Sequence, residues 1–134
     1  MYGLKLLKAH GLRGLEISRV TEAILLPILT YASPAWWGFL NVEEKTRLNA
    51  ILLRTHKWGL INEIKIIATL VGDLDIKLFS NILGNPAHCL HHMLPPVRQT
   101  TYNLRQRPHN RTLPATSTLL KKNFLNRMLY KDSY

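Results

Sequence analysis

Apolar residues recur three and four positions apart along much of the chain, which is the spacing of one helix face. The clearest run extends from residue 15 to about residue 31, with Ile17, Ile24 and Ile28 among its apolar positions. Pro34 follows this run and should end the helix, because the residue before a proline avoids helical geometry. The width of the apolar face predicts that this helix is central and buried.

Shorter helices are expected on either side of this run. One covers residues 4–10, with Gly11 at the position of a helix stop. Another begins after Asn41, because Asn41 followed three residues later by Glu44 is the asparagine form of a capping box. That helix should reach about Trp58, with Leu48, Ile51, Leu52 and Trp58 on its core side.

Glycine and proline mark the remaining boundaries. We expect one short helix over residues 63–71 that Gly72 ends, and another over residues 74–83 that Asp73 caps. Prolines interrupt residues 95–118, which predicts an extended, weakly packed tail before a final short helix at residues 119–130. The chain shows no internal repeat and no strand alternation. The expected fold is mainly α, with a small thumb-like helical bundle at residues 1–94 and an extended basic C-terminal tail at residues 95–134.

The net charge of the chain says more about its function than its length does. The chain has 134 residues, 46% of them hydrophobic, which is enough for a usable core. It carries 18 Lys and Arg against 8 Asp and Glu, a formal charge of +10 and a pI near 10.1. No carboxylate occurs between Ile76 and Lys131. Such a basic domain attracts polyanions, of which nucleic acid and an anionic membrane are the usual ones.

Two features bear on the compartment. Cys89 is the single cysteine, so an internal disulfide is impossible and the chain suits a reducing environment. Residues 23–42 carry no charge and are long enough to span a bilayer. However, Pro27 and Pro34 within this stretch favour a kinked or terminated buried helix over a spanning one.

Residues that could carry chemistry are sparse. The close carboxylates Glu43–Glu44 and Asp73/Asp75 stand at predicted helix starts, where acids favour the helix dipole, and we interpret them as capping residues. The run His88–His92 contains zinc-ligand types, but it lacks the second ligand pair of a structural zinc site and suits a packed loop. We therefore expect no catalytic centre, no metal and no cofactor.

Basic and aromatic side chains are the remaining candidates. Trp36, Trp37 and Trp58 can stack on bases, although their apolar neighbours favour the core. The Lys and Arg excess favours phosphate contacts, which position a duplex without reading its sequence. The candidate nucleic-acid-binding residues are Lys5, Lys8, Arg47, Arg54, Lys57, Arg105, Arg107, Arg111, Lys121 and Lys122.

Several segments together bring a family to mind. The run from Ile24 to Trp36, ILLPILTYASPAW, resembles the segment after the palm in reverse transcriptases of non-long-terminal-repeat (LINE-type) retrotransposons. The preceding residues 4–11 resemble it as well. Residues 88–96, 102–107 and 123–130 look like the tail of the same proteins, in the same order.

This resemblance implies a thumb-like helical bundle, followed by a connector, that grips an RNA–DNA or DNA primer–template duplex. The paired aspartates of the palm, in a Tyr-x-Asp-Asp type motif, cannot be placed here, so the chain looks like a fragment that does not synthesise DNA by itself. A missing palm domain would then be a partner. Two alternatives remain: a decayed fragment that serves as a helical interaction module or has no retained role, and a small membrane protein built on residues 23–42.

Overall fold

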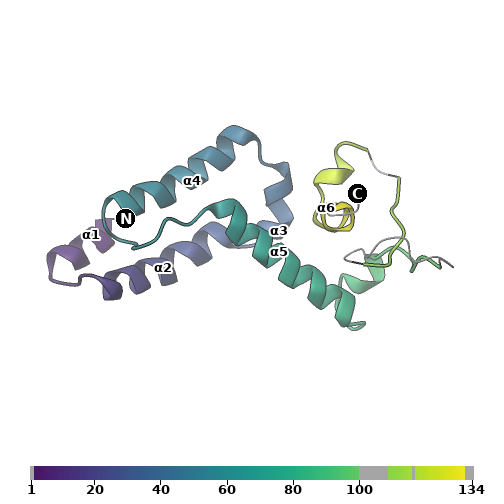
Figure 1. The fold of residues 1–134 in the computed structure, drawn as a ribbon, viewed down its shortest axis with the longest axis horizontal. Helices are drawn as coiled ribbons and strands as arrows, with labels where there is room; N and C mark the ends of the chain where they lie inside the picture. The colour runs from purple at the N-terminus through teal and green to yellow at the C-terminus, as the bar shows by residue number, and fades with distance from the viewer. Residues whose placement is uncertain (1, 100–108, 116, 132–134) are drawn as a thin grey trace. The chain divides into compact units, whose positions relative to one another are not determined.

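The computed structural model describes residues 2–99, 109–115 and 117–131. Its helices are α1 (Tyr2–Ala9), α2 (Leu15–Thr30), α3 (Ser33–Trp36), α4 (Val42–Lys57), α5 (Ile67–Gly84) and α6 (Phe124–Tyr130) (Figure 1). Three single 3₁₀ turns accompany them: η1 (Trp37–Phe39), η2 (His91–Met93) and η3 (Leu120–Lys122). Within these described residues, the extended backbone pairs only at an isolated antiparallel bridge between Val97 and Arg111. The mainly α class is therefore confirmed.

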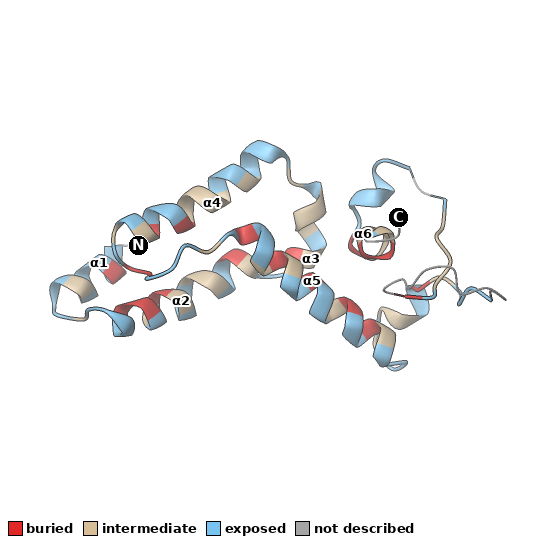
Figure 2. Ribbon diagram, viewed as in Figure 1, coloured by how far each residue is buried: buried red, intermediate tan, exposed pale blue. Residues whose placement is uncertain are grey.

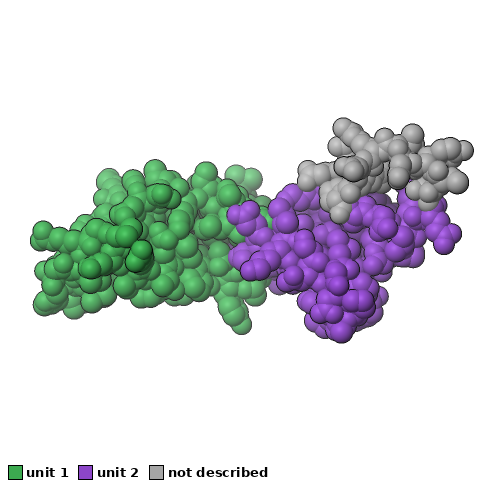
Figure 3. Space-filling view, turned by 60° about the horizontal axis from the view of Figure 1, so that its bottom comes forward, with its two compact units in different colours: residues 1–33, 40–72 green, residues 34–39, 73–134 purple. Residues whose placement is uncertain are grey.

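The chain forms two compact units, coloured separately in Figure 3. Unit 1 comprises residues 1–33 and 40–72, and unit 2 comprises residues 34–39 and 73–134. The change from one unit to the other falls inside α5, whereas the sequence pattern suggested a division after residue 94. Residues 73–94 thus group with the C-terminal part of the chain.

The core of unit 1 joins α1 and α2. Leu4 of α1, Ile17 of α2 and Leu60 are all buried together, and Trp58 is packed against them. The stretch of α2 that follows is more open than expected: Ile24 and Ile28 are 49% and 68% exposed, so a fully buried α2 was a wrong prediction (Figure 2).

The length of α1 explains this exposure. Ile24 and Ile28 lie seven and eleven residues after Ile17, close to whole numbers of turns, so all three point from nearly the same side of α2. However, α1 has only eight residues and packs on α2 near Ile17. The apolar stripe therefore continues for about 10 to 16 Å beyond Ile17, at 1.5 Å per residue, without α1 to cover it.

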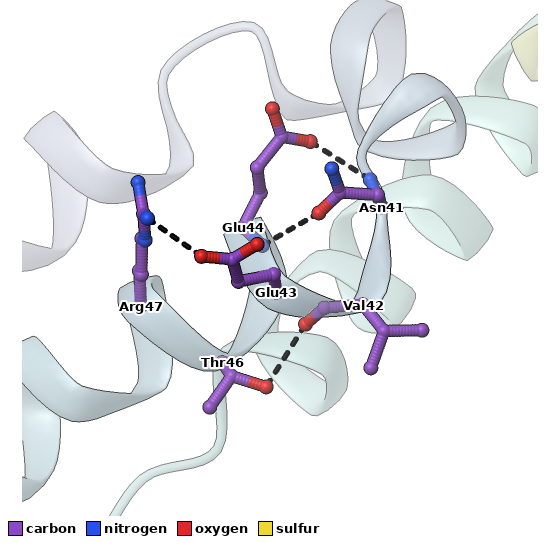
Figure 4. Close-up of polar contacts among 6 residues, drawn as sticks. All are labelled: Asn41, Val42, Glu43, Glu44, Thr46 and Arg47. Carbon is purple, nitrogen blue, oxygen red and sulfur yellow. Dashed lines mark hydrogen bonds and ion pairs between the residues drawn. The ribbon is translucent and has the colours of Figure 1, made fainter.

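The start of α4 matches its prediction closely (Figure 4). The Asn41 side-chain oxygen accepts from the Glu44 backbone N–H, and the Glu44 carboxylate accepts from the Asn41 backbone N–H, both at 2.8 Å. This reciprocal pair satisfies two of the backbone donors that a helix start leaves free. Leu52 is buried, while Leu48, Ile51 and Trp58 are half-buried, as expected for the core side of this helix.

Helix α5 corrects two expectations. It is continuous from Ile67 to Gly84, so the predicted break at Gly72 and Asp73 is wrong. A glycine inside a helix costs only about 1 kcal/mol, which burial of Val71, Phe79 and Ile82 along α5 readily offsets. Its first N–H, from Ile67, is satisfied by the Asn49 side chain of α4 at 3.0 Å, a partner that local sequence does not indicate. Asp73 and Asp75 consequently lie inside a helix, and a capping role for them is wrong.

The core of unit 2 is built from α5 and α6, with Phe79, Ile82, Leu94, Phe124, Met128 and Leu129 buried together. One final helix was expected at residues 119–130, but the structure has two separate elements there, η3 and α6, because Asn123 between them has an extended backbone and caps the start of α6. The described part of the proline-containing tail is better packed than predicted. His109 is buried, with its Nε2 atom 2.8 Å from the Leu129 carbonyl oxygen, and Leu113 packs against the core. Residues 100–108 and 116 lie outside the described residues.

The uncharged stretch at residues 23–42 is divided among α2, α3, η1 and the start of α4. In the described part of the chain, no helix has both the length and the apolar character needed to cross a bilayer.

Candidate nucleic-acid interface

Two basic side chains of α1 contact the end of α4. The Lys5 ammonium of α1 lies 3.7 Å from the centroid of the Trp58 ring, and Lys8 donates to the Trp58 carbonyl oxygen at 2.5 Å. Lys57, the last residue of α4, is exposed and precedes Trp58 in the chain. We call Lys5, Lys8, Lys57 and Trp58 the Trp58 cluster.

The way α4 ends accounts for this arrangement. The Gly59 N–H bonds to the His56 carbonyl oxygen at 2.8 Å, and the Leu60 N–H bonds to the Thr55 carbonyl oxygen at 3.1 Å. These two bonds, with Gly59 at φ +62°, form the glycine-ended turn known as a Schellman motif. The turn directs Leu60 into the core against Leu4, and so brings α1 with its two lysines beside Trp58.

No carboxylate in the described part of the chain forms an ion pair with a lysine of the Trp58 cluster. Three ion pairs occur among the described residues, Arg47–Glu43, Lys65–Glu22 and Arg127–Asp75, and none includes a residue of this cluster. An aromatic ring and a carbonyl oxygen are neutral partners, so neither compensates the positive charge of Lys5 and Lys8. The negative end of the α4 dipole offsets part of it, which stabilises the cluster modestly.

The other candidates on α4 differ in their surroundings. Arg47 and Arg54 lie on nearly the same side of the helix, seven residues apart, with Lys57 one turn further on. Arg47 pairs with Glu43 at 2.6 Å, with both side chains more than 70% exposed, so the arginine charge is locally compensated (Figure 4). Arg54 is exposed, and no carboxylate pairs with it among the described residues.

The basic candidates of unit 2 also differ in whether they are exposed or bonded within the protein. Lys121 and Lys122 are exposed on η3, and the Lys121 ammonium lies 5.7 Å from the centroid of the Tyr130 ring. Arg111 is half-buried and donates to the Pro95 carbonyl oxygen at 3.1 Å, which holds the loop ends together and favours a structural role. Arg105 and Arg107 lie outside the described residues.

Sequence reasoning missed a buried ion pair in unit 2. Arg127 of α6 contacts Asp75 of α5 at 2.6 Å, with side-chain exposures of 22% and 6%. Burial raises the pKa of Asp75 above its ordinary value of 3.8, and the Arg127 charge opposes this rise only in part. One signal was available, because Asp75 stands four residues from both Val71 and Phe79, which are core positions.

This ion pair lines a pocket of about 500 Å³ within unit 2. The Asp75 Oδ1 and Arg127 Nη1 atoms are covered from solvent and have no hydrogen-bond partner in the described part of the chain. A buried polar atom without a partner costs about 1–3 kcal/mol. The lining residues are Trp37, Asp75, Lys121, Arg127, Met128, Tyr130 and Lys131.

Two histidines of the loop at residues 88–92 bond to the protein backbone. His91 Nδ1 lies 2.7 Å from the Ile82 carbonyl oxygen, and His88 Nδ1 accepts from the Leu90 N–H at 3.1 Å. Leu90 and Leu94 pack on the unit 2 core. Among the residues that the structure describes, no three His, Cys, Asp or Glu side chains gather as metal ligands do.

No family model, curated protein or solved structure matches this chain.

Proposed function

We propose that the chain is a non-catalytic, nucleic-acid-binding fragment of a retrotransposon RNA-directed DNA polymerase. It grips an RNA–DNA or DNA duplex through its phosphates and does not read its sequence. The observation that supports this proposal best is the Trp58 cluster, in which Lys5 and Lys8 of α1 contact Trp58 at the end of α4 and form no ion pair with a carboxylate of the described residues.

The physical basis is the release of counterions from the duplex. Each phosphate that a Lys or Arg neutralises frees condensed cations, so affinity falls by roughly 0.9 log units per log unit of salt for each contact. Exposed Arg54, three residues before Lys57 on α4, extends the Trp58 cluster and adds a contact in unit 1. Lys121 and Lys122 supply contacts in unit 2.

A second candidate function is a helical protein-interaction module. The exposed apolar side chains of Ile24, Ile28 and Tyr31 favour it, with exposures of 49%, 68% and 80%. Exposed apolar patches often mark surfaces that bind a partner. In this alternative a palm domain of the enzyme that the chain resembles is one such partner, and a decayed chain with no role would leave the same surface unused.

A filter-binding titration on an RNA–DNA hybrid, repeated at several salt concentrations, tests the proposal. The matched variants are Lys57→Gln and Arg47→Gln, which remove one positive charge each from exposed positions on the same helix. We expect Lys57→Gln to weaken binding and to reduce the salt slope by about one. Arg47→Gln should change the slope less, because Glu43 already compensates Arg47.

Equal losses in the two variants would show that net charge alone attracts the duplex, and would refute the role of the Trp58 cluster. Binding that is absent, or that ignores salt, would refute the duplex grip itself. In that case, saturable binding of a separately expressed palm domain, lost in Ile28→Glu, would support the interaction module.

A further inference from the structure

The pocket of unit 2 shares Lys121 with the proposed duplex grip, and it is also lined by the rings of Trp37 and Tyr130 and by the Arg127–Asp75 ion pair. We propose that it binds one unpaired nucleotide, with the base against the rings of Trp37 and Tyr130 and the phosphate at Lys121 and Lys131. This inference rests on the proposed function, since it assumes that the chain meets nucleic acid, and it adds single-stranded residues to what the chain recognises.

The size and walls of the pocket suit a base. A volume of about 500 Å³ lies within the range of roughly 300–1,000 Å³ that is typical of small-molecule sites. Of the described residues that line it, Trp37 and Tyr130 are aromatic, and Met128 adds an apolar surface. Proteins that hold single-stranded nucleic acid stack successive bases on such rings, largely without sequence preference.

The charges around the pocket suit an attached phosphate. Among the described residues that line the pocket, Lys121, Arg127 and Lys131 are basic and Asp75 is the acidic one. Lys121 is exposed and its ammonium lies 5.7 Å from the centroid of the Tyr130 ring, so a cation stands beside an aromatic surface. A nucleotide has the complementary arrangement, with an anionic group beside a flat ring.

The polar atoms at the pocket favour a base over other aromatic anions. Asp75 Oδ1 is an acceptor and Arg127 Nη1 a donor, and neither has a partner among the described residues. Each base presents N–H donors or ring acceptors on its edge, and adenine presents both side by side. The phenyl ring of a phosphotyrosine peptide presents neither. A base that displaces the side chains covering these two atoms would satisfy both at once.

Binding of adenosine 5′-monophosphate to the full chain, followed by equilibrium dialysis, tests this inference. Adenosine and ribose 5-phosphate serve as the two halves of the probe. We expect saturable binding of the whole nucleotide and at least about tenfold weaker binding of either half, because stacking and phosphate contacts both contribute. Lys121→Glu should weaken binding by about tenfold, whereas Lys77→Glu, an equal charge change on α5 outside the pocket lining, should not.

Three results would overturn the inference: no saturable binding, ribose 5-phosphate binding as tightly as the nucleotide, or a phosphotyrosine peptide competing equally well. Failure here is separable from failure of the duplex grip. A chain that binds the RNA–DNA hybrid but not the nucleotide refutes the pocket alone. A chain that binds the nucleotide but not the hybrid refutes the duplex grip and supports the pocket.

Discussion

The Arg127–Asp75 pair offers a quantitative test of how unit 2 is held together. Replacing Arg127 by methionine keeps an unbranched apolar stem but leaves the Asp75 carboxylate, whose side chain is 6% exposed, without its cation. Breaking a buried ion pair in this way costs about 3–5 kcal/mol. Because Arg127 is itself 22% exposed, we expect the lower end, about 3 kcal/mol. That is a large share of the roughly 5–15 kcal/mol that stabilises a typical domain.

Urea unfolding followed by far-ultraviolet circular dichroism measures this loss. Lys77→Met is the matched control, because it removes one exposed charge from α5 and should change the free energy of unfolding by less than about 0.5 kcal/mol. The double variant Asp75→Leu/Arg127→Met should regain most of the loss, since an apolar pair can replace a buried ion pair. A loss below about 1 kcal/mol for Arg127→Met, or a double variant no better than the single one, would refute the reasoning.

Three further predictions follow from local geometry. Asn41→Ala removes the capping bond to the Glu44 N–H and should cost about 1 kcal/mol in thermal unfolding; an unchanged midpoint would contradict the cap. A methyl group at Gly38 would overlap the Lys122 carbonyl oxygen and lie 2.6 Å from Arg127 Nη1, so Gly38→Ala should displace η1 and lower the unfolding midpoint, while Gly3→Ala, in open space, should not. Burial raises the pKa of Asp75 in the folded state, so the folded chain holds the Asp75 proton at a pH where the unfolded chain has lost it. The wild type should therefore lose stability, relative to Asp75→Asn, as pH rises from about 3.8 through that raised pKa. A relative gain over the same pH range would mean that Arg127 outweighs burial.

Local patterns allowed much of the helical structure to be predicted. The Asn41–Glu44 capping box joins residues only three positions apart, so the local sequence is sufficient to predict it. The mainly α class follows from similar short-range spacing. The same local reasoning failed at Gly72, where tertiary burial along α5 overrides a weak helix former.

The candidate site could be predicted less well, because its contacts join residues that are distant in sequence. The Lys8–Trp58 bond joins residues 50 positions apart, and the Arg127–Asp75 pair joins residues 52 apart. A count of basic residues indicates an attraction to phosphate, but it does not distinguish Lys57 from Arg47, which Glu43 compensates. Similarly, it does not show that Arg111 bonds to a backbone carbonyl.

Lysine acetylation footprinting in the presence of an RNA–DNA hybrid tests the central claim most directly. Mass spectrometry would report the modification rate of each lysine with and without the duplex. We predict that the duplex slows acetylation of Lys5 and Lys57 and leaves Lys65, which pairs with Glu22, unchanged. Equal rates at Lys5 and Lys57 with and without the duplex, at a concentration that saturates binding, would contradict a duplex grip through the Trp58 cluster.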